Sequence, residues 1–293
     1  MPKIIKDWIL VIAIFIGILI SPWVGYVSFL SPYLISTMLV FTFSSMSVRK
    51  LKIQKSHLLI LFIQLALAVS LYLLIAPFNK ILGMGIMVCA LCPTASAAPA
   101  MVKMLDGDVS YLATYLLFVN LVMAAVIPVA FSWVMSSSDV AFGTICLGIM
   151  QRVGALLLVP LVVARLIKHT LPRTNKLLIK HSYLTFYMWV IALVIAIANT
   201  IRFFKMHDVE HSMLCQMAVA SLVICFLQFG IGRFCGVHFS NKVAICQALG
   251  QKNTILAIWM SQTFLHPLCS IMPACYVLWQ NLINSIQLAK KRK

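Results

Sequence analysis

A lysine in an apolar stretch is the most chemically distinctive feature of this sequence. Lys252 lies in the segment ALGQKNT (248–254), near the middle of a run that otherwise reads as membrane-spanning. Placing an ammonium at the centre of a bilayer costs about 2.5–3.5 kcal/mol on insertion scales, so a charge kept there faces a cavity, a partner or a ligand. The polar neighbours Gln251, Asn253 and Thr254 give the same stretch a polar side. Together they predict an ion or substrate site at membrane depth.

A second apolar stretch carries hydroxyls between two prolines. Its segment CPTASAAP (92–99) holds Thr94 and Ser96 between Pro93 and Pro99. Proline lacks a backbone donor and breaks a helix, and the freed backbone groups are tolerated in a membrane only beside a cavity or other protein. The two hydroxyls are expected to bond across a helix crossing or to cap a half-helix, with substrate contact as the alternative.

Composition indicates the elements that hold these residues. The chain has 293 residues, of which 62% are hydrophobic and 10% charged, and this balance is typical of a polytopic membrane protein. The predicted fold class is all-α, with ten transmembrane helices. Their expected ranges are 7–24, 29–47, 57–78, 81–105, 109–136, 142–168, 178–203, 209–232, 240–264 and 268–287.

The basic residues predict the orientation of these helices. Of the 23 lysines and arginines, three fall on predicted outer segments (Lys80, Arg202, Lys205) and three at membrane depth (Lys103, Arg152, Lys252), which leaves 17 on inner segments. The positive-inside rule therefore places both termini in the cytoplasm, in a multi-pass protein of the plasma (inner) membrane. Because the positive charge follows the helix ends, it predicts contact with lipid headgroups and no nucleic-acid partner.

Ten helices divide into two halves of five, 1–137 and 138–293, within a single transporter domain. An odd number of spans per half inverts the second half, which is the pattern of inverted-repeat transporters. The fourth and ninth helices occupy matching places, and both are interrupted, one by Pro93 and Pro99 and the other at Gly250. Matching breaks indicate a site near the membrane midplane.

These segments resemble the bile acid:sodium symporter superfamily. The fourth-helix segment 92–99, followed by Gly107-Asp108, is similar to that family's C-P-G-G-x-x-S-N and G-D pattern, and Gly250–Asn253 is similar to its E-x-G-x-Q-N pattern. The resemblance implies two crossing broken helices and transport of an organic anion by alternating access. It also implies that helices three to five and eight to ten move against a panel of helices one, two, six and seven.

The departures from that pattern fall on the family's sodium ligands. Ala98 and Pro99 stand where the family has Ser and Asn, and Ala248 and Lys252 stand where it has Glu and Gln. Two oxygen ligands of the fifth helix are replaced by leucines, Leu112 and Leu116, and the alignment places Gln64 at a further ion-site position. A hard cation needs several oxygen ligands, and an ammonium repels it, so we expect the fold to be kept and sodium coupling to be lost.

Several roles remain open for Lys252 at this point. Its ammonium could replace the missing ion, carry a proton, pair with an anionic substrate, or bond the freed carbonyls of the broken fourth helix. The leading hypothesis is a secondary transporter of a small organic anion. The alternatives are a sodium-coupled symporter with a rearranged ion site and a non-transporting sensor or scaffold.

No catalytic or metal-binding pattern is apparent in the sequence. The nine cysteines, Cys89 and Cys92 included, are expected to serve packing. We find no triad and no carboxylate pair at membrane depth, so we expect no enzyme activity, cofactor or metal. The sequence leaves the oligomeric state open.

Overall fold

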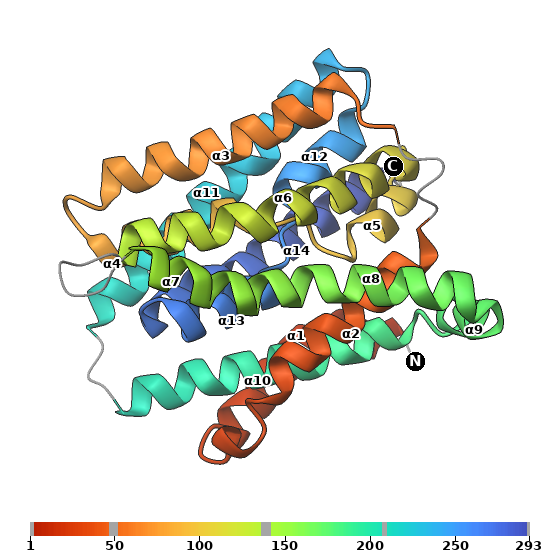
Figure 1. The fold of residues 1–293 in the computed structure, drawn as a ribbon. Helices are drawn as coiled ribbons and strands as arrows, with labels where there is room; N and C mark the ends of the chain where they lie inside the picture. The colour runs from red at the N-terminus through yellow and green to blue at the C-terminus, as the bar shows by residue number, and fades with distance from the viewer. Residues whose placement is uncertain (1–2, 47–51, 136–141, 207–209, 292–293) are drawn as a thin grey trace. The chain divides into compact units, whose positions relative to one another are not determined.

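The computed structural model describes residues 3–46, 52–135, 142–206 and 210–291, and these residues are dominated by α-helix (Figure 1). The described residues form no β-strand, but Thr94 and Lys252 form an isolated antiparallel β-bridge. In chain order the α-helices are α1 Lys3–Ile20, α2 Leu30–Ser45, α3 Lys55–Ile75, α4 Lys80–Leu91, α5 Ala98–Met104, α6 Val109–Met135, α7 Phe142–Ile149, α8 Ala155–Thr170, α9 Pro172–Lys180, α10 Leu184–Met206, α11 His211–His238, α12 Lys242–Gly250, α13 Thr254–Phe264 and α14 Ile271–Lys291.

Five of the helical segments are long and apolar enough to cross a membrane. They are α3, α6, α10, α11 and the continuous segment Phe142–Thr170. The outer face of α3 is apolar: Phe62, Leu73 and Leu74 are each more than half exposed. Large apolar side chains exposed along a whole helix fit a lipid environment and are rare on soluble proteins. The structure is that of an all-α protein with the features of an integral membrane protein.

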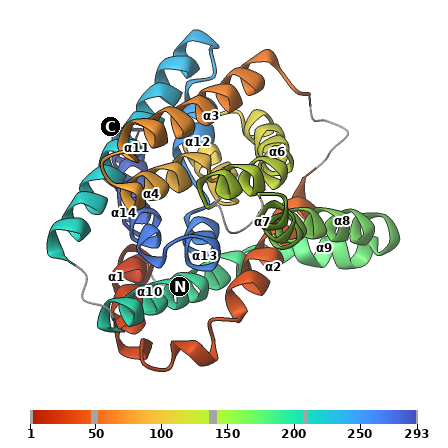
Figure 2. The same cartoon turned by 60° about the vertical axis from the view of Figure 1, so that its left-hand side comes forward.

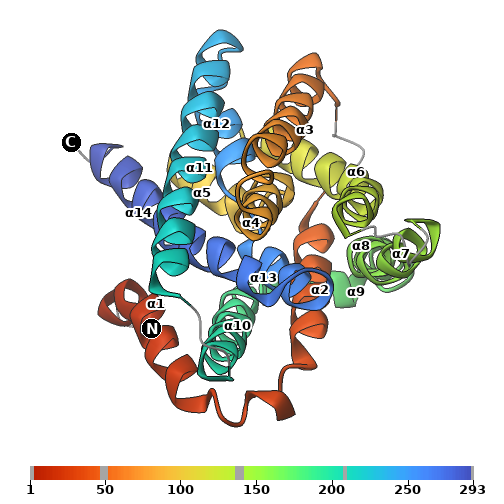
Figure 3. The same ribbon diagram turned by 90° about the vertical axis from the view of Figure 1, so that its left-hand side faces the viewer.

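The chain divides into two compact units. The first contains Met1–Ser45 and Leu156–His211, and the second contains Met46–Ala155 and Ser212–Lys293. In the first unit α10 packs against α1 and α2 (Figure 3). Its core includes Val24, Ile195 and Ala198, and a Cβ added at Gly17 would lie 2.8 Å from Ile197 Cγ2, so α1 and α10 approach closely.

The second unit holds the two interrupted helices. In it α3 packs against α4, and α14 packs against α4 and α13 (Figure 2). The long helix α6 contacts α4, α5 and α12, and its side chains Leu112, Tyr115, Leu116 and Phe131 are fully buried. The pieces α4, α5, α12 and α13 therefore lie inside one body whose internal contacts can be described.

Most predicted helices match an observed one, and the differences have physical causes. The expected helix 178–203 is wrong at its start: α10 begins at Leu184, and α9 occupies much of what was expected to be a loop. Pro172 ends α8 because it cannot donate, yet it suits the first turn of α9. The expected helix 209–232 ends too early, since α11 continues to His238, and a π-helical turn at Met150–Gly154 interrupts the sixth segment.

Some predicted features cannot be compared with the structure. The basic residues Arg49 and Lys50 after the second helix, the serines and Asp139 of segment 136–139, and the C-terminal residues 292–293 lie outside the described residues.

Two glycines on α11 allow the backbone of α12 to approach closely. A Cβ added at Gly236 would lie 2.7 Å from Lys242 Cα, and one added at Gly232 would lie 3.0 Å from Cys246 Cα. Because these neighbours are backbone atoms, they cannot rotate away. We expect Gly236→Ala to lower the unfolding free energy by about 1–3 kcal/mol, measured as a lower thermal midpoint in detergent.

The matched control lies on the same helix. Gly230 has no atom within 4 Å of its added Cβ, so Gly230→Ala should be neutral or stabilising by about 0.5–1 kcal/mol through helix propensity. Equal thermal midpoints for the two variants would contradict the close approach.

Candidate functional site

The predicted fourth transmembrane segment, 81–105, is broken between α4 and α5. Pro93 cannot continue the hydrogen-bond ladder, and Cys92 before it is extended, with φ −52° and ψ 133°. Residues 92–94 are buried although they are not helical. Pro99 does not act as a second break, contrary to the sequence interpretation: it lies in the first turn of α5, after Ala98, where a missing N–H is harmless.

The predicted ninth segment, 240–264, is broken between α12 and α13. The helix α12 ends at Gly250, where the ring of Phe229 occupies the space that a Cβ would need. Gln251 is extended, and Asn253 is the N-cap of α13, where its Oδ1 accepts a hydrogen bond from Leu256 N at 3.3 Å. Glycine is therefore needed at position 250 because another side chain is packed there, and the turn itself uses no positive φ.

The two breaks pair with each other. Asn253 N donates to Pro93 O at 2.9 Å, and Ala95 N donates to Gln251 O at 2.9 Å. These reciprocal bonds make the antiparallel bridge centred on Thr94 and Lys252. Each broken segment thus satisfies backbone groups that its own break set free.

The two central side chains make equivalent bonds in opposite directions. Lys252 Nζ donates to Ala90 O at 3.1 Å, and Thr94 Oγ1 donates to Ala248 O at 2.7 Å. Each acceptor lies four residues before the central residue of the opposite segment. Each side chain therefore caps the carboxyl end of the half-helix across the crossing, and the bridge has the pattern of a local two-fold axis.

Amides from neighbouring helices cover the remaining carbonyls at the end of α4. Gln64 Nε2 on α3 donates to Leu91 O at 3.1 Å and Cys92 O at 3.0 Å, and its Oε1 accepts from Tyr115 OH at 3.0 Å. Gln228 Nε2 on α11 reaches Cys89 O at 3.5 Å. Helix ends leave such carbonyls unpaired, so these amides let α4 end inside the protein.

The backbone groups of the second break, from Gly250 to Asn253, are covered by α14 and by the opposite break. Tyr276 OH donates to Gly250 O at 2.7 Å, and Gln280 Oε1 accepts from Lys252 N at 3.0 Å. Cys92 Sγ donates to Asn253 O at 2.9 Å. Tyr276 is fully buried, and its hydroxyl is bonded at the crossing.

Lys252 is buried, with 1% of its surface exposed. The six acidic residues of the chain are Asp7, Asp106, Asp108, Asp139, Asp208 and Glu210, and all lie at the ends of predicted helices. Among the described residues, no carboxylate forms an ion pair with Lys252. The favourable charge that Lys252 meets is the negative carboxyl end of α4, where Ala90 accepts its hydrogen bond.

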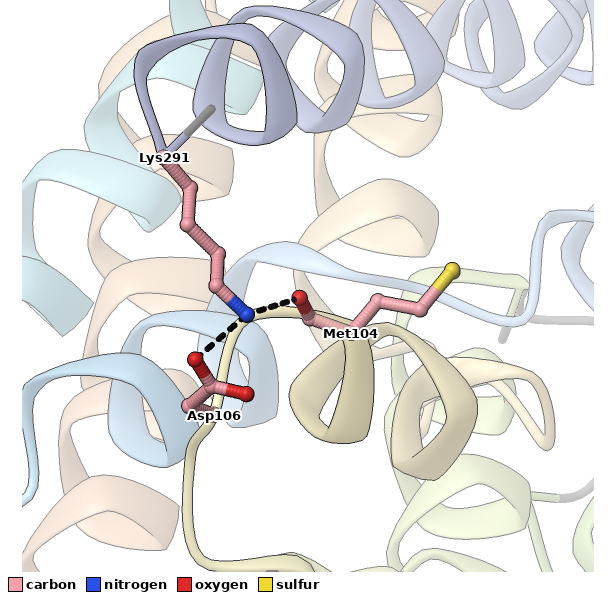
Figure 4. A network of polar contacts seen from close by, with 3 residues as sticks. All are labelled: Met104, Asp106 and Lys291. Carbon is pink, nitrogen blue, oxygen red and sulfur yellow. Dashed lines mark hydrogen bonds and ion pairs between the residues drawn. The ribbon is translucent and has the colours of Figure 1, made fainter. Parts of the chain in front are cut away.

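The ion pair found within the described residues lies away from the crossing. Lys291, at the end of α14, pairs with the carboxylate of Asp106, and its Nζ also donates to Met104 O at 2.8 Å (Figure 4). Asp108 Oδ1 accepts from Tyr111 N at 2.9 Å and caps α6. The two aspartates thus act as connectors and caps.

Most of the predicted site residues lie at or beside the crossing. Gln64, Thr94, Gln251, Lys252 and Thr254 are buried, and Ser96, Asn253 and Pro99 are half-buried. The Oε1 of Gln251 is buried without a hydrogen-bond partner in the structure. Ala97, which precedes α5, makes no side-chain cap, so the expectation that Ser96 caps this half-helix gains no support.

Sequence reasoning missed Gln228, Gln280 and Tyr115. Gln228 and Gln280 are polar side chains inside otherwise apolar helices, and this signal alone would have justified including them. Tyr115 had no such signal, because a tyrosine in an apolar helix is usually packing. Leu112 and Leu116, which the resemblance aligned with oxygen ligands, are fully buried and bring no oxygen from their side chains.

Comparison with known proteins assigns no family. No protein-family model matches the chain, and a search of curated proteins finds no match. The geometry of the crossing therefore carries the functional argument.

Proposed function

We propose that this chain is a secondary transporter of a small organic anion that works by alternating access without sodium coupling. The observation that carries the proposal is the reciprocal crossing of two broken segments around Thr94 and Lys252. Lys252 is buried there and pairs with no described carboxylate. Broken helices that cross at membrane depth are the usual place for a transported solute. A basic side chain there, with no acidic partner among the described residues, favours an anionic solute.

The proposal includes ten spans and an inverted repeat. The spans are α1, α2, α3, α4 with α5, α6, Phe142–Thr170, α10, α11, α12 with α13, and α14. The equivalence of Lys252 to Thr94, each bonded to a carbonyl four residues before the other, supports an inverted repeat that superimposes the fourth span on the ninth. Both termini are then on the same side, which the basic residues make the cytoplasm.

The two compact units support a transport mechanism. The first unit combines spans one, two and seven with the second half of span six, and the second unit combines spans three to five and eight to ten with the first half of span six. Their membership follows the panel and mobile bundle that the resemblance to bile acid:sodium symporters implies. In alternating access one such body moves relative to the other around the binding site.

The hydrogen-bond donors at the carboxyl end of α4 support the loss of sodium coupling. A sodium ion needs several oxygen ligands, whereas here an ammonium already binds Ala90 O, and Gln64 already donates to Leu91 O and Cys92 O. The alternative of a sodium symporter with a rearranged site would need these donors to leave. Of the roles left open for Lys252, an ammonium that replaces the missing ion agrees best with these contacts.

Flux in proteoliposomes tests the proposal. We expect uptake of at least one member of a panel of radiolabelled small carboxylates and sulfonates, with equal rates in sodium and choline chloride. Lys252→Gln should reduce the uptake by roughly tenfold or more, because the partner of the anion is lost. Lys103→Gln removes one charge from an exposed site on α5 and serves as the matched control.

The alternatives predict different outcomes of this experiment. Sodium-dependent uptake would favour a symporter with a rearranged ion site. Absence of flux for the whole panel would favour a sensor or scaffold. Equal uptake by wild type and Lys252→Gln would exclude the proposed role of the lysine.

A further inference from the structure

The short helix α9 carries a basic face that points away from the rest of its unit. Arg173, Lys176 and Lys180 are spaced by three and four residues, so they share one face of the helix. All three are exposed. Asn175 is the buried residue of α9, and α9 packs against α2. With 3.6 residues per turn, the three basic side chains lie on the side opposite to Asn175.

Apolar side chains flank this basic face. Leu177 is 55% exposed and Ile179 is 43% exposed, and the helical repeat places them on either side of the three basic residues. A helix with low mean hydropathy, basic residues on one face and exposed apolar residues beside them is typical of an element that lies in the membrane interface.

No acidic residue close to α9 in sequence can neutralise the basic face. The sequence contains no Asp or Glu between residues 140 and 207. Arg173, Lys176 and Lys180 make no ion pair with any described residue. The segment also lies on the side of the membrane that the positive-inside rule makes cytoplasmic, where the surface is negatively charged.

We infer that α9 binds anionic phospholipid headgroups at the inner membrane surface. Arg173, Lys176 and Lys180 contact the phosphates, and Leu177 and Ile179 enter the boundary between headgroups and acyl chains. This inference goes beyond the proposed function and does not depend on transport. It gives the unit that contains α1, α2 and α10 an anchor at the membrane surface, whether or not the protein moves a solute.

Lipid titration of the purified protein tests the inference. The thermal midpoint is measured in detergent micelles that contain increasing mole fractions of phosphatidylglycerol or of phosphatidylcholine. We expect phosphatidylglycerol to raise the midpoint of the wild type more than phosphatidylcholine does. The triple variant Arg173→Gln, Lys176→Gln, Lys180→Gln should need about a hundredfold more phosphatidylglycerol for half of the shift, because each basic residue near an anionic surface contributes about 1 kcal/mol to binding.

Matched variants separate a specific face from general positive charge. Lys52→Gln, Lys55→Gln, Lys242→Gln removes three exposed charges from other predicted inner segments and should keep the wild-type response. Arg173→Lys should also keep it, since the charge remains. Inorganic phosphate at the same concentration should not reproduce the shift, because it cannot engage Leu177 and Ile179.

Two outcomes would overturn the inference. One is a triple variant of α9 that retains the full response to phosphatidylglycerol, and the other is a control triple that loses as much. If the α9 triple variant does not fold, Lys176→Gln alone, with an expected shift of about fivefold in the half-saturating lipid fraction, gives the same comparison.

Discussion

Replacing Lys252 by alanine is expected to make the folded protein depend on a small cation from solution. The substitution removes the ammonium that donates to Ala90 O and leaves space at the negative carboxyl end of α4. Methylammonium reproduces the lost Cε and Nζ atoms, and sodium can bind the freed carbonyl of Ala90. At about 100 times its dissociation constant, such a ligand stabilises the folded state by about 2.7 kcal/mol.

The thermal midpoint in sodium, methylammonium, potassium and choline chloride measures this dependence. Wild type should be indifferent to sodium, because its site is filled by the tethered ammonium. Lys252→Met is the control, since methionine fills the space without a charge and should show no rescue. Stabilisation of the wild type by sodium would contradict the idea of a tethered cation, and so would a Lys252→Ala variant that ignores both sodium and methylammonium.

Gln64→Leu is expected to be the most destabilising single change at the crossing. It leaves Leu91 O and Cys92 O without their donor and Tyr115 OH without its acceptor, all in a buried place. An unpaired buried polar group costs about 1–3 kcal/mol, so we expect a loss of about 3–5 kcal/mol. A lower thermal midpoint, with the helical circular-dichroism signal retained at low temperature, would show this loss.

Tyr115→Phe separates the two halves of this interaction. It removes only the hydroxyl that donates to Gln64 Oε1, so the expected loss is about 0.5–1.5 kcal/mol. The double variant should be little worse than Gln64→Leu alone, because the two groups share one bond. If Gln64→Leu were as stable as Tyr115→Phe, then groups other than Gln64 would donate to the carbonyls at the end of α4.

The fold could be predicted well where the hydrophobic pattern is long and its ends are marked. The apolar runs predicted α3 and α6 within a few residues, and Pro93 and Gly250 predicted the two interruptions. The bounds of α9, α10 and α11 could not be predicted in the same way. A short amphipathic helix has no long apolar run, and Pro172 reads equally as a loop residue or as the first residue of a helix. The ten spans and the orientation stay predictions.

By itself, the sequence determined that this is an all-helical chain with several membrane-length apolar segments. It also predicted that Lys252 lies in one such segment, and it shows no acidic residue close to Lys252 in sequence. Only the tertiary structure decided that Lys252 donates to Ala90 O, that Thr94 donates to Ala248 O, and that Gln64, Gln228 and Tyr276 complete the helix ends. Periodicity reports which residues avoid water along one segment. The donor that pairs with a freed carbonyl comes from a segment up to about 160 residues away, and that choice depends on how the helices cross.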